Sequence, residues 1–323
     1  MDEINPLKNN KTVYIIIPVH NRKEITVSCL AQLKKNGDLD QYAVVVVDDA
    51  STDGTSEAIR TLFPEVIILE GDGNLWWTGA IKKGMEYAYH QGADYFIWLN
   101  DDCLVKADAV NKLVGFCKQE SKAIVGCQGY EVNENEQIAF GGYIKENSLI
   151  QLMKSALVKP QDCRTYPQEP YDVLNGNFVC LPRQVVDIVG FPNPKIAPHY
   201  FGDFIFTAQA KNRGMRLLVK DIDGVHNTSN ERSPTYPKRW LFMEGKPWRP
   251  LRLVFSKESI LSLKVNFTYF RLLYRYPKGL AAFFVYYIFR IFIPIVIISV
   301  LRFFPFSFRS KFSAFKSKIK NTT

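Results

Sequence analysis

The sequence predicts an α/β fold, in which a mostly parallel sheet is flanked by helices, followed by a helical C-terminal region. Three observations predict it. Short apolar runs rich in β-formers alternate with segments of helical spacing through the first two thirds of the 323 residues. Two of these runs end in a pair of aspartates, which is typical of ligand sites at the carboxyl edge of a parallel sheet. The last third is basic and contains a long apolar run.

The predicted strands and helices follow one another in order. Residues 12–18 form a first β-rich run, and the spacing of 21–35 predicts a helix after it, with Asn21 as a possible cap. We predict further strands at 44–47, 66–69, 95–99, 124–128 and 173–181, and helices at 56–63, 108–119 and 202–213, while 74–91 is predicted to be a loop that leads into a helix. Right-handed crossovers between such elements make the sheet mostly parallel. Between 129 and 170 the pattern is weaker, and Gly141-Gly142 suggests a hairpin or loops.

The charge is divided unevenly along the chain. From Arg232 to the end there are 18 Lys and Arg against two Glu, a net charge of +16, and the remainder carries −7. This predicts two domains, 1–231 and 232–323, of which the second would face an anionic surface, either nucleic acid or the cytoplasmic leaflet of a membrane. The six cysteines lack metal-type pair spacing, and the polar start has no signal-peptide core, so we expect reduced thiols in the cytosol.

The paired aspartates predict a site. Asp48 and Asp49 end one apolar run, and Asp101 and Asp102 end another. Because parallel strands present their carboxyl ends at one edge, both pairs should converge there. Carboxylates suit a divalent cation, which could meet a phosphorylated ligand at this edge. The sequence therefore points to an enzyme.

An ordered set of motifs carries a family resemblance. The motifs are Ile17-Pro-Val-His-Asn-Arg22, Val47-Asp-Asp-Ala-Ser-Thr-Asp-Gly54, Gly73-Asn-Leu-Trp-Trp-Thr-Gly-Ala80, Leu99-Asn-Asp-Asp102, Asn175-Gly-Asn177 and Gly202-Asp203. Over about residues 13–227 the chain resembles glycosyltransferase family 2, whose members have the GT-A fold and use nucleotide-sugar donors. The stretch 73–80 is most similar to bacterial rhamnosyl- and galactofuranosyltransferase-type members.

The resemblance implies a donor pocket. Asp48 or Asp49 would contact the base or ribose, with Pro18 and Arg22 lining the pocket, although these carboxylates could instead cap the following loop. Asn74 and Gly79 would belong to a donor-binding loop at a helix start. Trp76 and Trp77 would either stack on the sugar or belong to the core.

The resemblance also implies a metal ion. Asp102 would be the main ligand of Mn²⁺ or Mg²⁺ on the donor diphosphate, and Asp101 would face the ribose, because Asn100 stands where many members have the first aspartate. His226, 23 residues after Asp203, would be a further ligand, although a lone histidine is often a packed or surface residue. A solvated turn is the alternative for the aspartates.

Asp203 matches the family's catalytic base, which takes the proton from the acceptor hydroxyl in an inverting, direct displacement. An ordinary helix cap is the alternative. His199 could contact the acceptor or the diphosphate, and Gly202 and Asn177 would line the acceptor site.

Residues 280–301 form an almost wholly apolar stretch of 22 residues, enough to span a bilayer, although Arg290 and Pro294 interrupt it. Both flanks are basic, so a single span would place one of them on the wrong side of the membrane. We therefore favour a monotopic, peripheral arrangement on the cytoplasmic face of the cell membrane. A true span, and a helical core or oligomer interface, are the alternatives.

These interpretations combine into one hypothesis. The protein would be an inverting, metal-dependent glycosyltransferase that adds a sugar to a lipid-linked or polysaccharide acceptor in bacterial cell-surface glycan synthesis, without nucleic acid as a partner. A catalytically degenerate membrane scaffold and a nucleic-acid-binding protein are the rivals. A dinucleotide-dependent oxidoreductase is disfavoured because the first βα turn lacks a Gly-x-Gly-x-x-Gly loop.

Overall fold

The computed structural model describes residues 11–132, 137–148, 150, 152, 160–165, 171–222, 225–227 and 240–320, with side chains for all of these except 226, 227 and 314–320. They divide into two compact units. The N-terminal unit lies within 1–145 and 158–228, and the C-terminal unit within 146–157 and 229–323. The predicted domain boundary after residue 231 falls outside the described residues.

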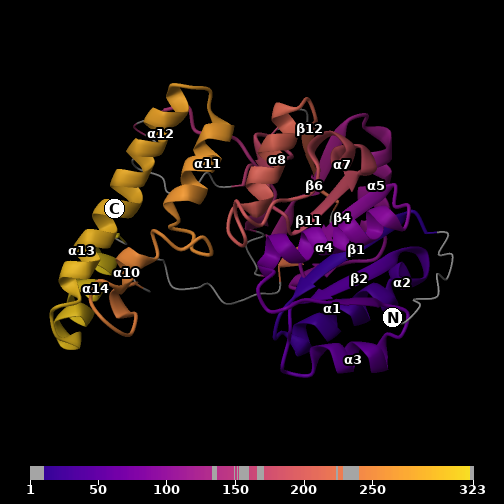
Figure 1. Cartoon of the computed structure of the whole chain (residues 1–323), viewed down its shortest axis with the longest axis horizontal. Helices are drawn as coiled ribbons and strands as arrows, with labels where there is room; N and C mark the ends of the chain where they lie inside the picture. The colour runs from indigo at the N-terminus through magenta and orange to yellow at the C-terminus, as the bar shows by residue number, and fades with distance from the viewer. Residues whose placement is uncertain are drawn as a thin grey trace. The chain divides into compact units, whose positions relative to one another are not determined.

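A seven-stranded sheet forms the centre of the N-terminal unit (Figure 1). Its strands, in spatial order, are β12 (Arg216–Lys220), β6 (Ala123–Cys127), β11 (Phe178–Pro182), β4 (Tyr95–Leu99), β1 (Val13–Val19), β2 (Ala43–Asp48) and β3 (Ile67–Glu70). Neighbouring strands are parallel except on both sides of β11, which is antiparallel to β4 and β6. The predicted α/β class with a mostly parallel sheet is confirmed.

Helices cover the sheet on two sides. They are α1 (Lys23–Lys35), α2 (Asp38–Gln41), α3 (Thr55–Leu62), α4 (Trp76–His90), α5 (Ala109–Gln119), α7 (Arg183–Val189) and α8 (Gly202–Asn212). Alternate residues of β1 enter different cores: Ile15 packs in a cluster with Leu30 of α1, and Ile16 in a cluster with Met85 of α4. Burial on both faces explains why the strands have continuous apolar sequences.

Two small sheets lie beside the large one. The first contains β5 (Cys103–Val105), β13 (Val225–Asn227), β7 (Gly129–Glu131) and β8 (Ile138–Phe140), and the second β9 (Gly142–Tyr143) and β10 (Val173–Leu174). β7 and β8 form an antiparallel pair with a register shift, so this part of the weakly patterned region is a hairpin. β13 pairs with β5 so that His226 lies opposite Leu104.

The predicted cap at Asn21 is wrong. Helix α1 begins at Lys23, and Asn21 precedes it with a φ of 51°. Its side-chain oxygen accepts a hydrogen bond from Thr52 N at 2.8 Å, and its own N–H donates to Ser51 Oγ at 2.8 Å. Asn21 therefore joins the β1 end to the loop after β2, because asparagine tolerates this left-handed conformation.

The C-terminal unit is helical. It contains α10 (Arg249–Arg252), α11 (Leu263–Leu273), α12 (Lys278–Tyr286), the π-helical segment η1 (Tyr287–Phe292), α13 (Ile293–Leu301) and α14 (Phe306–Lys320). Elements α12, η1 and α13 form one apolar helix, Lys278–Leu301, of 24 residues, which by length and composition could cross a membrane. Pro294 lies in the first turn of α13, directly after the π segment, and has no N–H to donate to the preceding turn.

Candidate active site

The order of strands in the sheet explains why the two aspartate pairs lie at one edge. Strands β4, β1 and β2 are adjacent and parallel, so Leu99, Val19 and Asp48 end at one edge. Asp49 N donates to Val19 O at 2.9 Å, which joins two of these ends directly. Pro18, one residue earlier, pairs with Val47 and remains partly exposed. This carboxyl edge is where ligands bind in open α/β sheets.

Arg22 connects the first strand end to the Asp101-Asp102 pair. Its guanidinium lies 3.2 Å from Asp101 Oδ1 through Nη1 and 3.3 Å from Asp102 Oδ2 through Nη2. The Asp101 side chain is 1% exposed, whereas that of Asp102 is 17% exposed. Asp101 also accepts a hydrogen bond from Thr26 Oγ1 at 2.9 Å. Burial raises the pKa of Asp101 to about 6, although Arg22 and Thr26 act against it.

The two aspartates therefore differ in what they can contact. Asp101 points into the protein and holds Arg22 and α1, so its predicted contact with ribose has little surface available. Asp102 is the more accessible of the pair. It is the carboxylate that can meet a ligand at this edge.

Asp48 and Asp49 are both buried and both bind the loops that follow. Asp48 accepts hydrogen bonds from Ser51 N at 2.9 Å and from Ser56 Oγ. Asp49 accepts from Gly73 N at 2.8 Å and from Trp76 N at 2.9 Å. Both carboxylates thus cap the loops that follow them, and their contact with a nucleotide stays a prediction.

The loop before α4 presents one tryptophan outward and one inward. Trp76 is 43% exposed, and its ring centroid lies 5.4 Å from that of His199. Trp77 is partly buried, and its ring meets that of Trp98 edge-on at 5.5 Å. Trp76 is therefore the tryptophan available to a sugar, and Trp77 belongs mainly to the core.

Of the other two residues predicted in this loop, one is exposed and the other is buried. Asn74 is exposed, and its backbone N–H donates to Asp72 Oδ1 at 2.9 Å. Gly79 is buried inside α4, where an added Cβ would lie 3.2 Å from Leu75 Cβ. Asn74 can reach a ligand, while Gly79 serves helix packing.

Two consecutive side-chain hydrogen bonds connect α4 to the loop before β11. Trp77 Nε1 donates to Asn100 Oδ1 at 2.9 Å, and Asn100 Nδ2 donates to Asn177 Oδ1 at 2.9 Å. Asn100 was not among the predicted site residues. Its place between Leu99 and the aspartates was the available signal, because side chains at the end of β4 face the same edge.

Asp203 lies in the first turn of α8 and is held by backbone groups. Its Oδ2 accepts from Gly176 N and its Oδ1 from Phe204 N, both at 2.8 Å. Burial raises its pKa to about 6, despite these two hydrogen bonds. A carboxylate with a pKa near the working pH suits proton transfer. Tyr143, which sequence reasoning missed, is also close, and burial and the charge of Asp203 raise its pKa.

The residues just before Asp203 complete this side of the site. His199 packs between the rings of Trp76 and Tyr200, with centroid distances of 5.4 and 4.4 Å. Burial lowers the pKa of His199, which keeps the ring neutral near pH 7. Gly202 packs against Thr78: an added Cβ would lie 1.9 Å from Thr78 Oγ1. Gly202 thus allows the starts of α4 and α8 to approach, and Asn177 reaches the site through Asn100.

Of the two predicted metal ligands, the structure describes the side chain of Asp102 and not that of His226. In the part of the chain that the structure describes, no three His, Cys, Asp or Glu side chains are arranged to hold a metal ion. The side chain of His226 lies outside the described residues, but its backbone is opposite Leu104, two residues after Asp102. A single accessible carboxylate fits an ion such as Mg²⁺, which is often bound by one or two carboxylates together with substrate phosphates.

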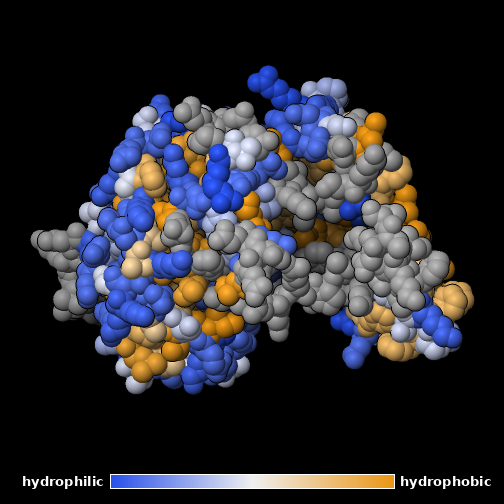
Figure 2. Space-filling view, turned by 180° about the vertical axis from the view of Figure 1, so that it is seen from behind, coloured by the Kyte–Doolittle hydropathy of each residue, from blue (hydrophilic) through white to orange (hydrophobic). Residues whose placement is uncertain are grey.

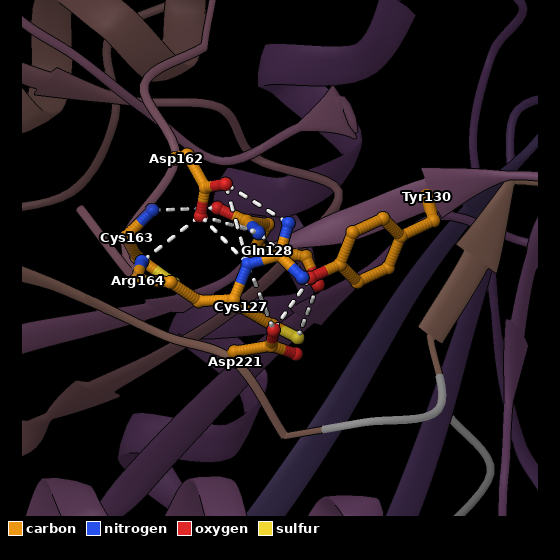
Figure 3. Close-up of polar contacts among 7 residues, drawn as sticks. All are labelled: Cys127, Gln128, Tyr130, Asp162, Cys163, Arg164 and Asp221. Atoms are coloured by element: carbon orange, nitrogen blue, oxygen red, sulfur yellow. Dashed lines mark hydrogen bonds and ion pairs between the residues drawn. The ribbon is translucent and has the colours of Figure 1, made fainter. Parts of the chain in front are cut away.

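A second polar cluster lies at the ends of β6 and β12 (Figure 3). Gln128 Nε2 donates to Tyr130 Oη at 2.7 Å, and Cys163 N donates to Gln128 Oε1 at 2.8 Å. The Arg164 guanidinium lowers the pKa of Asp162 to about 2. None of the predicted site residues belongs to this cluster, which fastens the segment 160–165 to the sheet.

Comparison with known proteins identifies the fold. The family model described as Glycosyl transferase family 2 matches residues 14–170, and no curated protein sequence matches the chain. Mannosyltransferase PcManGT from Pyrobaculum calidifontis, solved with GDP-Man and Mn²⁺, is 15% identical, with a TM-score of 0.51 over 87% of this chain and 76% of that chain. GalNAc-T7, solved with UDP, GalNAc and Mn²⁺, is 16% identical, with a TM-score of 0.53 over 67% of this chain and 43% of that chain. These similarities confirm the predicted GT-A fold.

Proposed function

Residues 14–170 match glycosyl transferase family 2 within a unit of GT-A fold, and from this premise we propose that the protein is an inverting glycosyltransferase that uses a nucleotide-sugar donor. The observation that carries the proposal is the Asp203 carboxylate. It is fixed by two backbone N–H groups, and its pKa of about 6 leaves it ionised near pH 7. The Gly176 contact ties it to the loop that also contains Asn177, beside the end of β4.

Asp203 acts as the general base of a single displacement. Its carboxylate takes the proton from an acceptor hydroxyl, whose oxygen forms the bond to the anomeric carbon. The bond from that carbon to the donor phosphate oxygen breaks, and its electron pair leaves with the nucleoside diphosphate. One displacement inverts the anomeric centre. His199, neutral at pH 7, and Trp76 form an aromatic wall on which a sugar ring can lie.

Asp102 and His226 would hold a Mn²⁺ or Mg²⁺ ion. Such an ion, when bound, neutralises the charge that develops on the departing diphosphate. The accessible Asp102 carboxylate supports this assignment, as does Mn²⁺ in the solved PcManGT and GalNAc-T7 complexes. Arg22, next to Asp102, would line the donor pocket together with Pro18, and Asn74 would belong to the donor-binding loop.

The acceptor class follows from the C-terminal unit. Its apolar helix, Lys278–Leu301, and the basic residues around it support a location at the cytoplasmic face of the cell membrane. A protein held there meets a lipid-linked or growing polysaccharide acceptor at a raised effective concentration. We therefore place the reaction in cell-surface glycan synthesis, with a rhamnosyl- or galactofuranosyl-type donor as the first to test.

Donor binding tests the proposal. We would measure binding of dTDP-rhamnose, UDP-galactofuranose, UDP-hexoses and GDP-mannose to the full chain, with and without Mn²⁺. We expect metal-dependent binding of one donor that is lost in Asp102→Ala. Glu120→Gln is the control, because it removes a carboxylate that pairs with Arg216 at the opposite edge of the sheet. Folded protein that binds every donor equally with and without metal, or none, would favour the membrane-scaffold alternative.

A further inference from the structure

The apolar helix of the C-terminal unit exposes one continuous face. We call this set the apolar face; its members are 39–68% exposed and comprise Phe284, Ile288, Phe289, Phe292, Ile293, Val296, Ile297, Val300, Phe303 and Phe304. Along the helix, the members from Phe284 to Val300 recur every three or four residues, which places them on one side, and Phe303 and Phe304 follow in the turn after Leu301. Figure 2 shows hydrophobic residues along the edge of this unit. Exposed apolar surface of this extent marks an interaction site.

The opposite side of the same helix is covered from one end to the other by its own unit. Near the start, the Tyr286 ring lies 5.0 Å from that of Phe270 in α11, and Tyr287 Oη donates to Leu261 O at 2.7 Å. At the end, the buried Arg302 donates to the backbone carbonyls of Trp240 and Gly245, both at 2.8 Å. Among the described residues of this unit, the helix is therefore covered on one side, and the apolar face remains exposed on the other.

Next to the end of the apolar face lies a basic hollow. Its volume is about 290 Å³, and we define it by its lining residues Lys246, Trp248, Arg249, Arg252, Leu253 and Ser256. The Trp248 ring, 44% exposed, lies 6.5 Å from that of Phe303 in the apolar face. The Lys246 ammonium nitrogen lies 5.6 Å from the centroid of the Trp248 ring. Cations and an indole beside apolar side chains are typical of surfaces that meet lipid headgroups.

The charges on and next to the apolar helix decide how the helix lies. Arg290 is in the middle of the apolar helix, and Arg249, Arg252 and Arg271 are exposed on the two helices that pack along it. If the helix crossed the bilayer, these side chains would be drawn into hydrocarbon, which is costly for a guanidinium. If it lies flat, the apolar face alone enters the lipid and the charges stay at headgroup level.

We propose that the apolar face inserts into one leaflet of an anionic phospholipid bilayer with the helix parallel to the surface, and that the basic hollow binds lipid phosphate groups. The inference rests on the membrane location in the proposed function and adds its orientation, the inserted residues and the headgroup site. It is independent of the donor chemistry of the N-terminal unit.

Vesicle binding by the full chain tests the partner. We expect flotation with vesicles of phosphatidylcholine and phosphatidylglycerol, and much weaker binding to phosphatidylcholine alone. The double variant Arg249→Gln/Arg252→Gln should weaken anionic binding by roughly 30-fold, and Phe289→Ser/Phe292→Ser should abolish flotation. Leu62→Ser, 50% exposed in the N-terminal unit, is the matched control and should bind normally. Equal binding to both vesicles, or no binding together with self-association through the apolar face, would overturn the proposal.

Depth measurements test the orientation. All six native cysteines are buried, so an introduced surface cysteine can be labelled selectively. We would place a fluorophore at Phe284→Cys, Phe292→Cys or Val300→Cys and quench it with lipids brominated at different depths. A flat helix gives equal depths at the three positions. A deep label at 292 with shallow labels at 284 and 300, which lie roughly 24 Å apart along the helix, would show a span instead.

Donor binding, measured on the same preparations, separates the two proposals. Protein that floats with anionic vesicles but binds no nucleotide sugar would refute the glycosyltransferase function and leave the lipid surface standing. Protein that binds donor but floats with no vesicle would refute the lipid surface and leave the donor site standing.

Discussion

Replacing Asp203 with asparagine should make the protein more stable at neutral pH while removing most of its transfer activity. The carboxyl pKa is raised from 3.8 to about 6 in the folded protein. The folded state therefore holds the proton more tightly than the unfolded chain does. Its stabilising contribution is fully present below pH 3.8 and is lost as the pH rises through about 6.

The magnitude follows from the size of this shift. At 1.36 kcal/mol per pKa unit, ionising the buried group costs about 3 kcal/mol at pH 7, of which about 2 kcal/mol develops between pH 4 and pH 7. Asparagine avoids this cost. Its single carbonyl oxygen can accept from Gly176 N or Phe204 N but not from both, which costs about 1 kcal/mol at every pH. The variant should thus be about as stable as the natural protein at pH 4 and about 2 kcal/mol more stable at pH 7.

Urea denaturation at a series of pH values measures this difference. Three of the five tryptophans, Trp76, Trp77 and Trp98, lie in the N-terminal unit and report its unfolding. Other titrating groups cancel when the variant is subtracted from the natural protein. A difference that stays flat from pH 4 to pH 7 would refute the reasoning. In parallel, transfer by the variant should fall by 10²- to 10⁴-fold, and transfer by the natural protein should decline as the pH falls through about 6.

Three further changes test other parts of the structure. Gly202→Ala would place a Cβ 1.9 Å from Thr78 Oγ1 and should destabilise the protein by about 1–3 kcal/mol, as measured by urea denaturation. Adding Thr78→Ala, which removes the hydroxyl, should recover part of the lost stability. Adding Thr78→Ser, which keeps it, should not. Arg302→Met removes the donor to the Trp240 and Gly245 carbonyls and should destabilise the C-terminal unit by about 3 kcal/mol. Faster hydrogen exchange at 240–253 would show this loss of stability, and unchanged exchange would contradict the prediction. Arg22→Gln removes the cation that pairs with Asp102 and should tighten Mn²⁺ binding in the absence of donor by roughly 10-fold, as measured by electron paramagnetic resonance. Weaker Mn²⁺ binding by this variant would show that Arg22 orients the carboxylate instead.

The sheet was predictable from the sequence because its strands are buried on both faces. Short apolar runs such as 44–47 and 95–99 predict buried strands when turn residues and helical segments surround them. The orientation of β11 was not predictable, since periodicity describes which face a residue occupies and contains no information about strand direction. Residues 173–181 looked like any other strand, yet β11 runs antiparallel to both of its neighbours.

The sequence predicted which segments would meet more than how individual atoms would lie. The loops that contain the motifs meet through Arg22, Asn100 and Gly176, and the roles of their residues stay predictions. The sequence could not show that Asp48 and Asp49 turn their oxygens toward nearby backbone N–H groups, because that depends on how each loop folds back. Tyr143 was missed because it lies in a part of the chain where the pattern is weak, and the fold brings it near enough for the charge of Asp203 to raise its pKa.

The reversed direction of β11 bears on where new specificities can arise in this protein. Because β11 runs antiparallel to its neighbours, the loop before it, with Asn175, Gly176 and Asn177, lies at the carboxyl edge of the parallel strands. The residues after Pro182 continue into α7 at the opposite edge. Variation upstream of this strand can therefore change the surroundings of the Asp203 carboxylate. Variation downstream of it is free to serve folding alone.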